Sequence, residues 1–211
     1  MNNMNQRVLG LVAGIGAFAA TGCMGAESGG AMTDGTVAEE GAEISADICP
    51  AGVPSTLKPA ADQTIKGKYN AVGVQVYVCT PTATSSTPSY VLVNPQANLM
   101  NDGGCLQGTH FIGPTWQGQD GSTVVGAKVA GATVDATALP WLLIKATSHA
   151  DDSGFFKDVT TIQRLATVGG NAPATGCDAT TVGTILQVPY SAEYVFYKTK
   201  SKGKVVQCGG S

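Results

Sequence analysis

The feature that most constrains the fold is a strict alternation of residue types along residues 72–79. Valines at the four even positions alternate there with Gly73, Gln75, Tyr77 and Cys79. A period of two puts the two sets on opposite faces of a strand, and β-branched valine favours extended backbone. The stretch therefore predicts a β-strand.

Similar short segments recur along the rest of the chain, and none has helical periodicity. Strands are predicted at residues 90–93, 122–130, 139–146, 157–167, 184–188, 193–198 and 204–208. The intervening signals are a Ser/Thr loop at 81–88, a stop at Asn94-Pro95, a hairpin turn at 101–104 and a Gly/Pro loop at 168–178. Roughly eight to ten short strands at this spacing predict an all-β fold. We expect a single antiparallel domain over residues 48–211, either a sandwich or a barrel.

Charge and length narrow the class of protein further. The chain has 211 residues, of which 13% are charged, and its formal net charge is −3. This length suits one domain plus a leader. Nucleic-acid binding needs a basic surface, so no nucleic-acid partner is expected.

The N-terminal segment predicts export. Arg7 is the only charged residue before an apolar run at residues 8–20. That run is too short for a membrane-spanning helix and is typical of a signal peptide. Residues 14–19 match a dinucleotide-binding fingerprint, but no strand precedes them and they are expected to be removed with the signal. We therefore expect no cofactor.

The leader ends at Ala20-Thr-Gly-Cys23, which is similar to a bacterial lipobox. In a lipobox the cysteine takes a lipid and becomes the mature N-terminus, although leucine is usual where this chain has Ala20. The alternative is an ordinary secretory signal cleaved near Gly22 or Ala26. We predict a signal peptide of the lipoprotein type over residues 1–22, with lipidation at Cys23.

A polar segment follows the lipidation site. Residues 23–47 are rich in Gly, Ala, Ser and Thr, with several carboxylates and no basic residue. Such a composition offers little to bury and predicts a disordered acidic tether. The expected partner is a membrane, reached through the lipid anchor, and the expected location is the cell envelope (outer membrane or surface lipoprotein) or the secreted medium.

Export also permits disulfides among the six cysteines. If Cys23 carries a lipid, five thiols remain, and two bridges among them allow roughly fifteen patterns. We predict a Cys79–Cys177 bridge, while buried free thiols are the alternative. A second bridge would be drawn from Cys49, Cys105 and Cys208. Cys-x-x-Cys spacing is absent, which argues against a zinc finger or a redox motif.

Between residues 57 and 198 the chain resembles a family of bacterial and fungal proteins, domain-of-unknown-function family 3455. The resemblance rests on ordered blocks at residues 73–79, 109–116 with 120–122, 139–143, 161–164, 169–173 with Cys177, and 188–197. It implies an exported β-rich protein with no established activity. Gln117 stands where the family often has an acidic residue, which weakens the case for acid/base chemistry beside it. Cys49, Cys105 and Cys208 are additions to the family pattern.

Candidate functional residues lie in the Gly- and Pro-rich stretch 108–126. His110, Trp116 and Asp120 are candidates to line a ligand pocket, and a His with an Asp can do acid/base work or hold a metal. The alternative is structural, with both rings packed on the sheet and Asp120-Gly121 forming a turn. A triad with Ser122 lacks the Gly-x-Ser-x-Gly elbow.

Two further sets of polar residues are candidates for a buried contact or a metal site. Gln163 and Arg164 lie on opposite faces of a predicted strand, and whichever points inward needs a partner. For a buried Arg164 the expected partner is a carboxylate such as Asp120 or Glu193. His149, Asp151 and Asp152 are more typical of a solvated turn than of a metal loop, so no metal is expected.

These observations favour a non-enzymatic, lipid-anchored binding or structural module. Its ligand would be a small molecule, a glycan or another envelope protein. The alternatives are a hydrolase-like or metal-dependent enzyme using His110 and Asp120, and a purely structural coat component. A pocket in which His110, Trp116, Asp120 and an inward Arg164 converge would favour ligand binding or catalysis.

Overall fold

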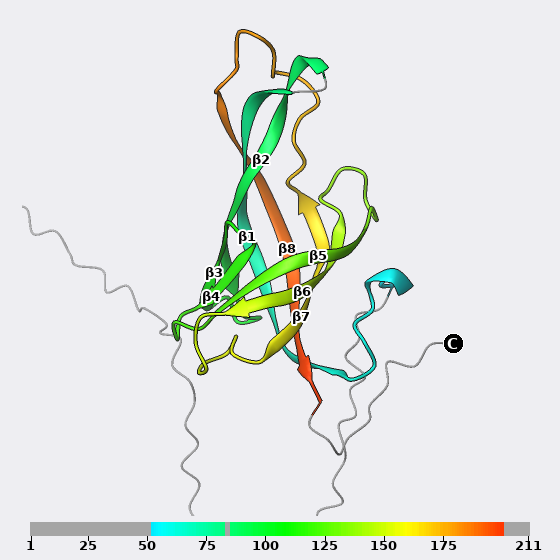
Figure 1. The fold of residues 1–211 in the computed structure, drawn as a ribbon, viewed down its shortest axis with the longest axis vertical. Coiled ribbons are helices and arrows are strands. Elements are labelled where there is room, and N and C mark those ends of the chain that lie inside the picture. The colour runs from blue at the N-terminus through cyan, green and yellow to red at the C-terminus, as the bar shows by residue number, and fades with distance from the viewer. Residues whose placement is uncertain (1–51, 83–84, 201–211) are drawn as a thin grey trace, which may run out of the picture. The chain divides into compact units, whose positions relative to one another are not determined.

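Eight antiparallel strands close into one barrel (Figure 1). The computed structural model describes residues 52–82 and 85–200, so the predicted signal peptide, tether and last strand at 204–208 lie outside the described residues. The strands are β1 (Gln63–Thr82), β2 (Ser85–Met100), β3 (Leu106–Phe111), β4 (Thr115–Gly118), β5 (Thr123–Ala132), β6 (Trp141–His149), β7 (Val159–Gly169) and β8 (Ile185–Thr199).

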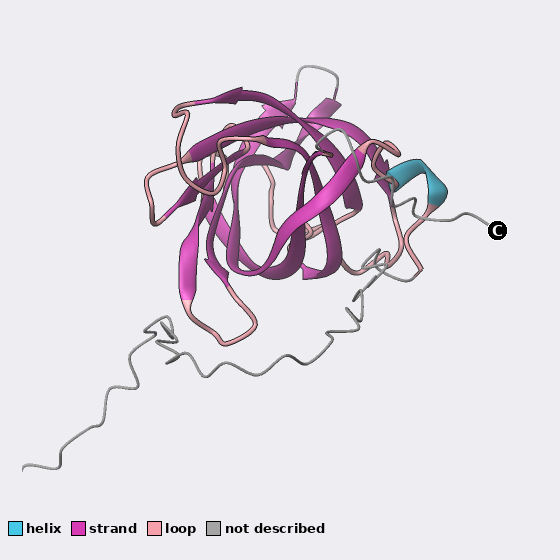
Figure 2. Cartoon of the chain, turned by 90° about the horizontal axis from the view of Figure 1, so that it is seen from below, coloured by secondary structure: helices cyan, strands magenta, loops and turns pink. Residues whose placement is uncertain are grey.

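The order of the strands around the barrel is their order in the sequence. Each strand pairs with the next, and β1 also pairs with β8 from Gln63↔Thr199 to Val78↔Ile185. Within the barrel, closure leaves no free sheet edge, which removes a route to aggregation, whereas β2 before Ala97 pairs with β1 alone. Figure 2, seen from below, shows the strands surrounding the interior. The all-β prediction is confirmed, and of the two expected architectures the chain adopts the barrel.

The alternating stretch of β1 buries Gln75 and Tyr77 of its non-valine face, and of its valines Val76 is buried as well, at 7% exposed. Gln75 and Tyr77 are 1% and 6% exposed, whereas Val72 is 59% exposed. The barrel interior therefore receives a glycine, an amide and a phenol from this strand. Aliphatic side chains are supplied by other strands, for example Leu99 in β2 and Ile162 in β7, both fully buried.

Aromatic rings fill much of the barrel interior. Phe155 and Phe156 come from the β6–β7 connection and contact Phe196 of β8, with ring centroids 5.8 and 5.0 Å apart. Tyr69 of β1 lies 4.9 Å from Phe155. Edge-to-face and tilted contacts of this kind add to the stabilisation that burial provides.

The outer face of the barrel is covered locally by the segment that immediately precedes β1. A single 3-10 turn, η1 (Ser55–Leu57), buries Leu57 completely. The Gln163 amide donates from Nε2 to the Leu57 carbonyl at 2.6 Å, and its Oε1 accepts from the Tyr197 hydroxyl at 2.6 Å. Both polar atoms of the Gln163 amide are thus hydrogen-bonded beneath this segment. The next residue, Arg164, points to the interior of the barrel. The described part of the chain contains no helix long and apolar enough to span a membrane.

Strands β1, β2 and β8 continue past the barrel, as Figure 1 shows. The connection before β8 packs on this extension, where the predicted disulfide joins Cys79 to Cys177 across a sequence separation of 98 residues. Tyr90 also donates to the Gly176 carbonyl at 3.0 Å. Cys105 is disulfide-bonded as well. Cys49 and Cys208, the other candidates for a second bridge, lie outside the described residues.

Several strand boundaries differ from the predictions. The Ser/Thr loop predicted at 81–88 is shorter, because β1 continues to Thr82 and β2 begins at Ser85. Two other differences arise because prolines are accommodated within strands. The stop predicted at Asn94-Pro95 is wrong, since β2 continues to Met100. Pro95 pairs with Gln75 beside a bulge between Val76 and Tyr77, and bulges tolerate a residue without an N–H donor. The separate strands predicted on either side of Pro189 form one strand, β8, because they pair continuously with β1.

Candidate functional site

The β3–β4 hairpin brings His110 and Trp116 together inside the barrel. They are direct cross-strand partners, and they are 3% and 0% exposed. Their rings stack with centroids 4.5 Å apart and planes 12° from parallel. The absence of a side chain at Gly126 makes room, because a Cβ there would lie 3.2 Å from the Trp116 ring and 2.5 Å from Ile144 Cγ2. The sequence-predicted pair therefore forms one unit in the core.

His110 is held as a neutral imidazole. Its Nδ1 lies 2.8 Å from the Thr115 carbonyl oxygen, which can only accept, so Nδ1 carries the proton. Burial lowers the pKa of His110 to about 3, with the Thr115 hydrogen bond opposing the shift and the charge of Arg164 adding to it. At neutral pH the ring therefore contributes no charge, and its Nε2 is an acceptor.

Arg164 of β7 points into the same region. Its Nε and Nη2 donate to the Pro140 carbonyl at 3.3 and 2.9 Å. It pairs across strands with Tyr194, whose hydroxyl lies within hydrogen-bonding reach of the guanidinium, and burial raises the pKa of that phenol. Among the described residues Arg164 has no ion pair. The expected carboxylate partner Glu193 instead contacts Lys68 at 3.2 Å.

These side chains line a cavity of about 440 Å³ at one end of the barrel. Most of its lining is apolar, the polar residues are few, and none of the described residues that line it is acidic. The lining residues are Gln75, Leu92, Val93, Asn94, Pro95, His110, Gly113, Pro114, Trp116, Lys128, Pro140, Leu142, Ile144 and Arg164. A pocket of this size and character is typical of sites for small organic molecules.

Two buried donors in the pocket wall lack a protein partner. The indole Nε1 of Trp116 and the amide Nε2 of Gln75 make no hydrogen bond to any described residue. Gln75 is 1% exposed and Trp116 is fully buried. Leaving such a group unsatisfied costs about 1–3 kcal/mol, so unpaired buried donors are uncommon in native proteins.

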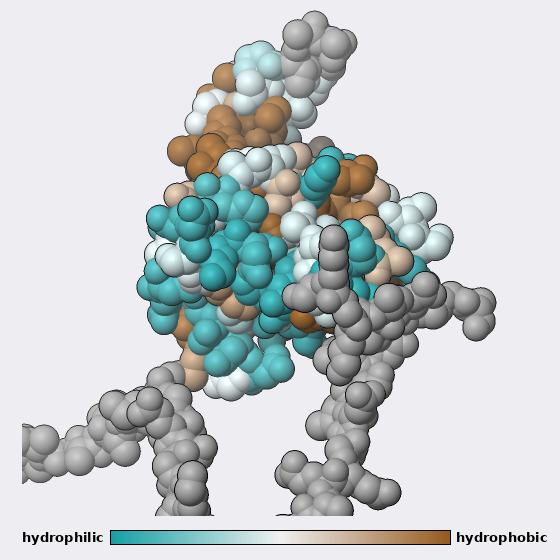
Figure 3. Space-filling model, turned by 60° about the horizontal axis from the view of Figure 1, so that its bottom comes forward, coloured by the Kyte–Doolittle hydropathy of each residue, from teal (hydrophilic) through white to brown (hydrophobic). Residues whose placement is uncertain are grey.

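A bulge in β2 shapes the mouth of the pocket. Tyr77 pairs with Leu92 and Val76 pairs with Asn94, which leaves Val93 as the extra residue. Both Leu92 and Val93 line the pocket, although neighbours in a regular strand face opposite sides. They are also about half exposed. Figure 3 shows apolar side chains gathering toward the upper end of the view, whereas the lower surface of the barrel is mainly hydrophilic.

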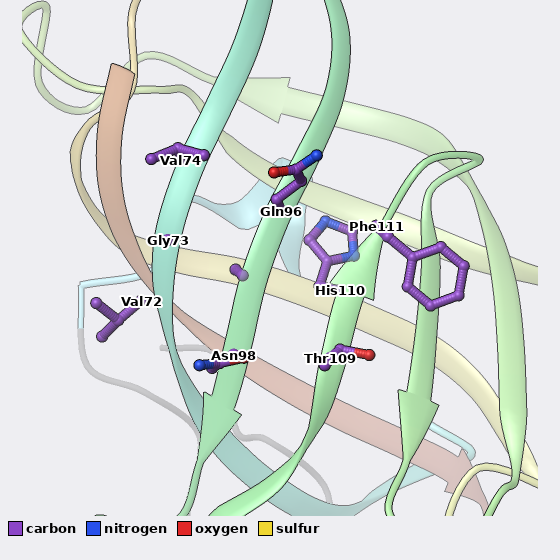
Figure 4. A pocket seen from close by; sticks show the side chains of 9 residues that line it. Val72, Gly73, Val74, Gln96, Asn98, Thr109, His110 and Phe111 are labelled. Atoms are coloured by element: carbon purple, nitrogen blue, oxygen red, sulfur yellow. The ribbon is translucent and has the colours of Figure 1, made fainter. Parts of the chain in front are cut away.

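A second depression of about 510 Å³ lies over β1, β2 and β3 (Figure 4). Gly73, Ala97 and His110 are cross-strand neighbours there, and in Figure 4 Val72 and Val74 point away from His110. The depression is more open than the first and has no charged side chain in its described lining. The depression therefore offers a ligand fewer specific contacts than the internal pocket does.

Asp120 lies outside the pocket, where it connects two loops. Its Oδ1 accepts from the Ser122 hydroxyl at 2.6 Å and the Ser122 N–H at 3.0 Å, and its Oδ2 accepts from the Phe155 N–H at 2.6 Å. The Ser122 hydroxyl bond is the main cause that holds the pKa of Asp120 below its usual value. Gly154, with φ at 76°, permits this close approach, because a Cβ there would lie 2.7 Å from Asp120 Oδ2.

The structure therefore does not assemble the catalytic groupings considered from the sequence. The Ser122 hydroxyl accepts from the Phe156 N–H at 3.0 Å, and His110 bonds to Thr115 rather than to Ser122 or Asp120. His149 donates from Nε2 to the Val159 carbonyl at 2.8 Å. Within residues 52–82 and 85–200 no group of three His, Cys, Asp or Glu side chains could hold a metal ion.

Sequence reasoning missed Gln75 and Lys128 as members of the site. Gln75 could have been found as the only amide among the small and aromatic residues on its face of β1. Lys128 carries no comparable signal, since an exposed lysine in a strand is ordinary. Of the four predicted ligand-binding residues, His110, Trp116 and Arg164 meet at the pocket and Asp120 does not.

These features define a class: a closed eight-stranded antiparallel barrel with an internal pocket lined by hydrogen-bond donors. The chain belongs to the family described as "Protein of unknown function (DUF3455)", whose model matches residues 59–198. The match confirms the resemblance found from the sequence blocks. A search of curated proteins and a search of solved structures each found no match to this chain.

Proposed function

We propose that this domain is a binding module that takes a small molecule with an apolar body and a hydrogen-bond acceptor into the barrel pocket. The observation that carries this proposal is the pair of unpartnered, buried donors, Trp116 Nε1 and Gln75 Nε2. A ligand acceptor that reaches either donor would satisfy it. In the free domain the unsatisfied donors lower stability, so a hydrogen bond from the ligand to such a donor would contribute to affinity.

The rest of the wall indicates what else the ligand contains. Leu142 and Ile144 come from β6, and Pro95 and Pro114 add further apolar surface. Burying apolar ligand area on such a surface contributes about 25 cal/mol per Å². A highly polar glycan would find few partners on these walls. The pocket therefore favours an organic molecule with one polar end.

The decisive experiment replaces Gln75 by methionine, which has a similar shape and no amide. The free domain should become more stable, because an unsatisfied donor has been replaced by an apolar group. Binding of the probes decanol and decanoate should weaken about two- to ten-fold, as loss of one hydrogen bond predicts. Stability would be measured by thermal unfolding and binding by tryptophan fluorescence titration, with the probes below their micelle concentrations.

A matched control separates the pocket from the outer wall. Trp116→Phe removes the pocket N–H and should weaken binding, whereas Trp141→Phe alters a partly buried residue packed on Leu165, Val195 and Tyr197 and should leave binding unchanged. Because both variants remove a tryptophan, their binding would be measured by calorimetry. The proposal fails if neither probe binds. It also fails if Gln75→Met destabilises the domain while binding is unaltered, because Gln75 would then serve the fold alone.

We also propose that this module operates in the cell envelope, anchored by a lipid on Cys23 through the acidic segment 23–47. The support is the apolar run at 8–20 and the lipobox-like sequence that follows it. In a bacterial host the full chain should partition into the detergent phase, and Cys23→Ser should move it to the aqueous phase. Continued detergent partition of Cys23→Ser would refute the anchor.

A further inference from the structure

We propose that the ligand of the barrel pocket is an organic monoanion, with a carboxylate or similar oxyanion against Arg164 and an apolar body along Leu142 and Ile144. This inference depends on the proposed binding function and adds the charge of the ligand. It assigns an anion-recognition role to Arg164.

The first support is the charge of Arg164, which no protein group balances. The guanidinium is partly buried, and its hydrogen-bonding neighbours are neutral: the Pro140 carbonyl, which accepts two bonds, and the Tyr194 hydroxyl. No described carboxylate forms an ion pair with it. A buried cation is normally paired, and guanidinium geometry matches a carboxylate well.

The second support is the sign of the charges on the residues that line the pocket. Lys128 adds another positive charge at the pocket and also has no ion pair within the described residues. The described lining includes no Asp or Glu, and His110 is neutral at physiological pH. The described lining therefore carries positive charge only, and low-polarity walls strengthen its action on an anion.

The third support is the type of hydrogen-bonding group on offer. Trp116 Nε1–H can only donate, and Gln75 Nε2 is likewise a donor. A carboxylate presents only acceptors, so it complements these groups together with Arg164. An ammonium group would place donors against these two donors and a positive charge beside Arg164, and the acceptor at His110 Nε2 does not offset that repulsion. The pocket thus discriminates by charge as well as by shape.

The test compares three probes with the same apolar chain: decanoate, decanol and decylamine. Decanoate should bind the wild-type domain at least about ten-fold more tightly than decanol, because a hydrogen bond to a charged group contributes more than a neutral one. Decylamine should bind most weakly. Raising the salt concentration should weaken decanoate and leave decanol unchanged.

Arg164→Gln keeps a donor for the Pro140 carbonyl and removes the charge. It should lose about ten- to hundred-fold in decanoate affinity while decanol binding persists, and Arg164→Lys should restore part of the preference. Lys157→Gln, which changes an exposed lysine outside the pocket lining, is the matched control and should have no effect. Persistent decanol binding in Arg164→Gln shows that the pocket is intact.

The outcomes distinguish the two proposals. If decanol and decanoate bind equally, or if Arg164→Gln keeps the preference for decanoate, the anion inference is overturned and the binding function stands. If none of the three probes binds the wild-type domain, both proposals fall.

Discussion

The imidazole of His110 lies parallel to the indole of Trp116, with ring centroids 4.5 Å apart, in the interior of the barrel. Tyr194 contacts both rings edge-on, at 5.1 and 5.4 Å. His110 and Trp116 line the pocket, while Trp116 and Tyr194 also belong to the main hydrophobic core. The stability of the fold and the shape of the pocket therefore depend on the same residues.

Trp116 should be among the most sensitive positions in the chain. Because it is fully buried, Trp116→Ala removes a large packed ring and should lower the free energy of unfolding by about 3–5 kcal/mol. Trp116→Phe should cost less, since much of the ring volume remains. Urea unfolding measures both values. The partly buried Trp141 is the reference, and a larger loss for Trp141→Ala than for Trp116→Ala would contradict this ranking.

His110 should make the domain sensitive to mild acid. Burial lowers its pKa to about 3 in the folded state from the ordinary histidine value of 6.5, so between these pH values the unfolded chain binds more protons. The contribution of neutral His110 to the free energy of unfolding should therefore be fully present above about pH 6.5. It should fall by on the order of 3–5 kcal/mol as the pH is lowered to 3. Urea midpoints against pH provide the measurement.

The matched variant for this pH effect is His110→Phe, which keeps an aromatic ring for the Trp116 stack and cannot titrate. Asp120 and Asp158 also have lowered pKa values and contribute their own acid dependence. The difference between the wild-type and variant profiles isolates the histidine. Parallel profiles between pH 6.5 and 4 would mean that protonation of His110 does not oppose folding.

Asp120 should matter for stability and not for binding. Asp120→Ala leaves the Phe155 N–H and the Ser122 groups without their acceptor and should cost about 1–3 kcal/mol in thermal or urea unfolding. Asp120→Asn should cost less, because its amide oxygen still accepts. Decanoate affinity of the folded variant should equal that of the wild type. A selective loss of binding in Asp120→Ala would restore Asp120 to the functional site.

The Cys79–Cys177 disulfide should stabilise the extension formed by β1, β2 and β8. It closes a long loop, with a sequence separation of 98 residues, and removing it should cost about 2–5 kcal/mol. The double variant Cys79→Ser, Cys177→Ser isolates this bridge, whereas a reductant would also open the bond of Cys105. Equal denaturation midpoints for the variant and the oxidised wild type would show that the bridge adds nothing to stability.

Much of the fold was predictable from local patterns. The alternation at residues 72–79 predicted the centre of β1, and the patterns at 122–130 and 157–167 predicted most of β5 and β7. Local rules failed at Pro95 and Pro189, because a bulge and a long partner strand carry the chain through both prolines. The site was predicted in part: His110, Trp116 and Arg164 were identified, and Gln75 and Lys128 were missed.

By itself the sequence determined the all-β class and the family, because these depend on residue type, spacing and order. The sequence allowed roughly fifteen disulfide patterns, and the structure confirms the Cys79–Cys177 bridge that we expected. Only the tertiary structure decided that Gln75 and Tyr77 of β1 are buried while Val72 is exposed, since alternation defines two faces without saying which one is buried. It also decided the roles of the polar residues. Asp120 connects two loops by hydrogen bonds, and Arg164 places a positive charge in the pocket. Neither role could be read from the sequence, because the pairing of distant strands decides which groups meet.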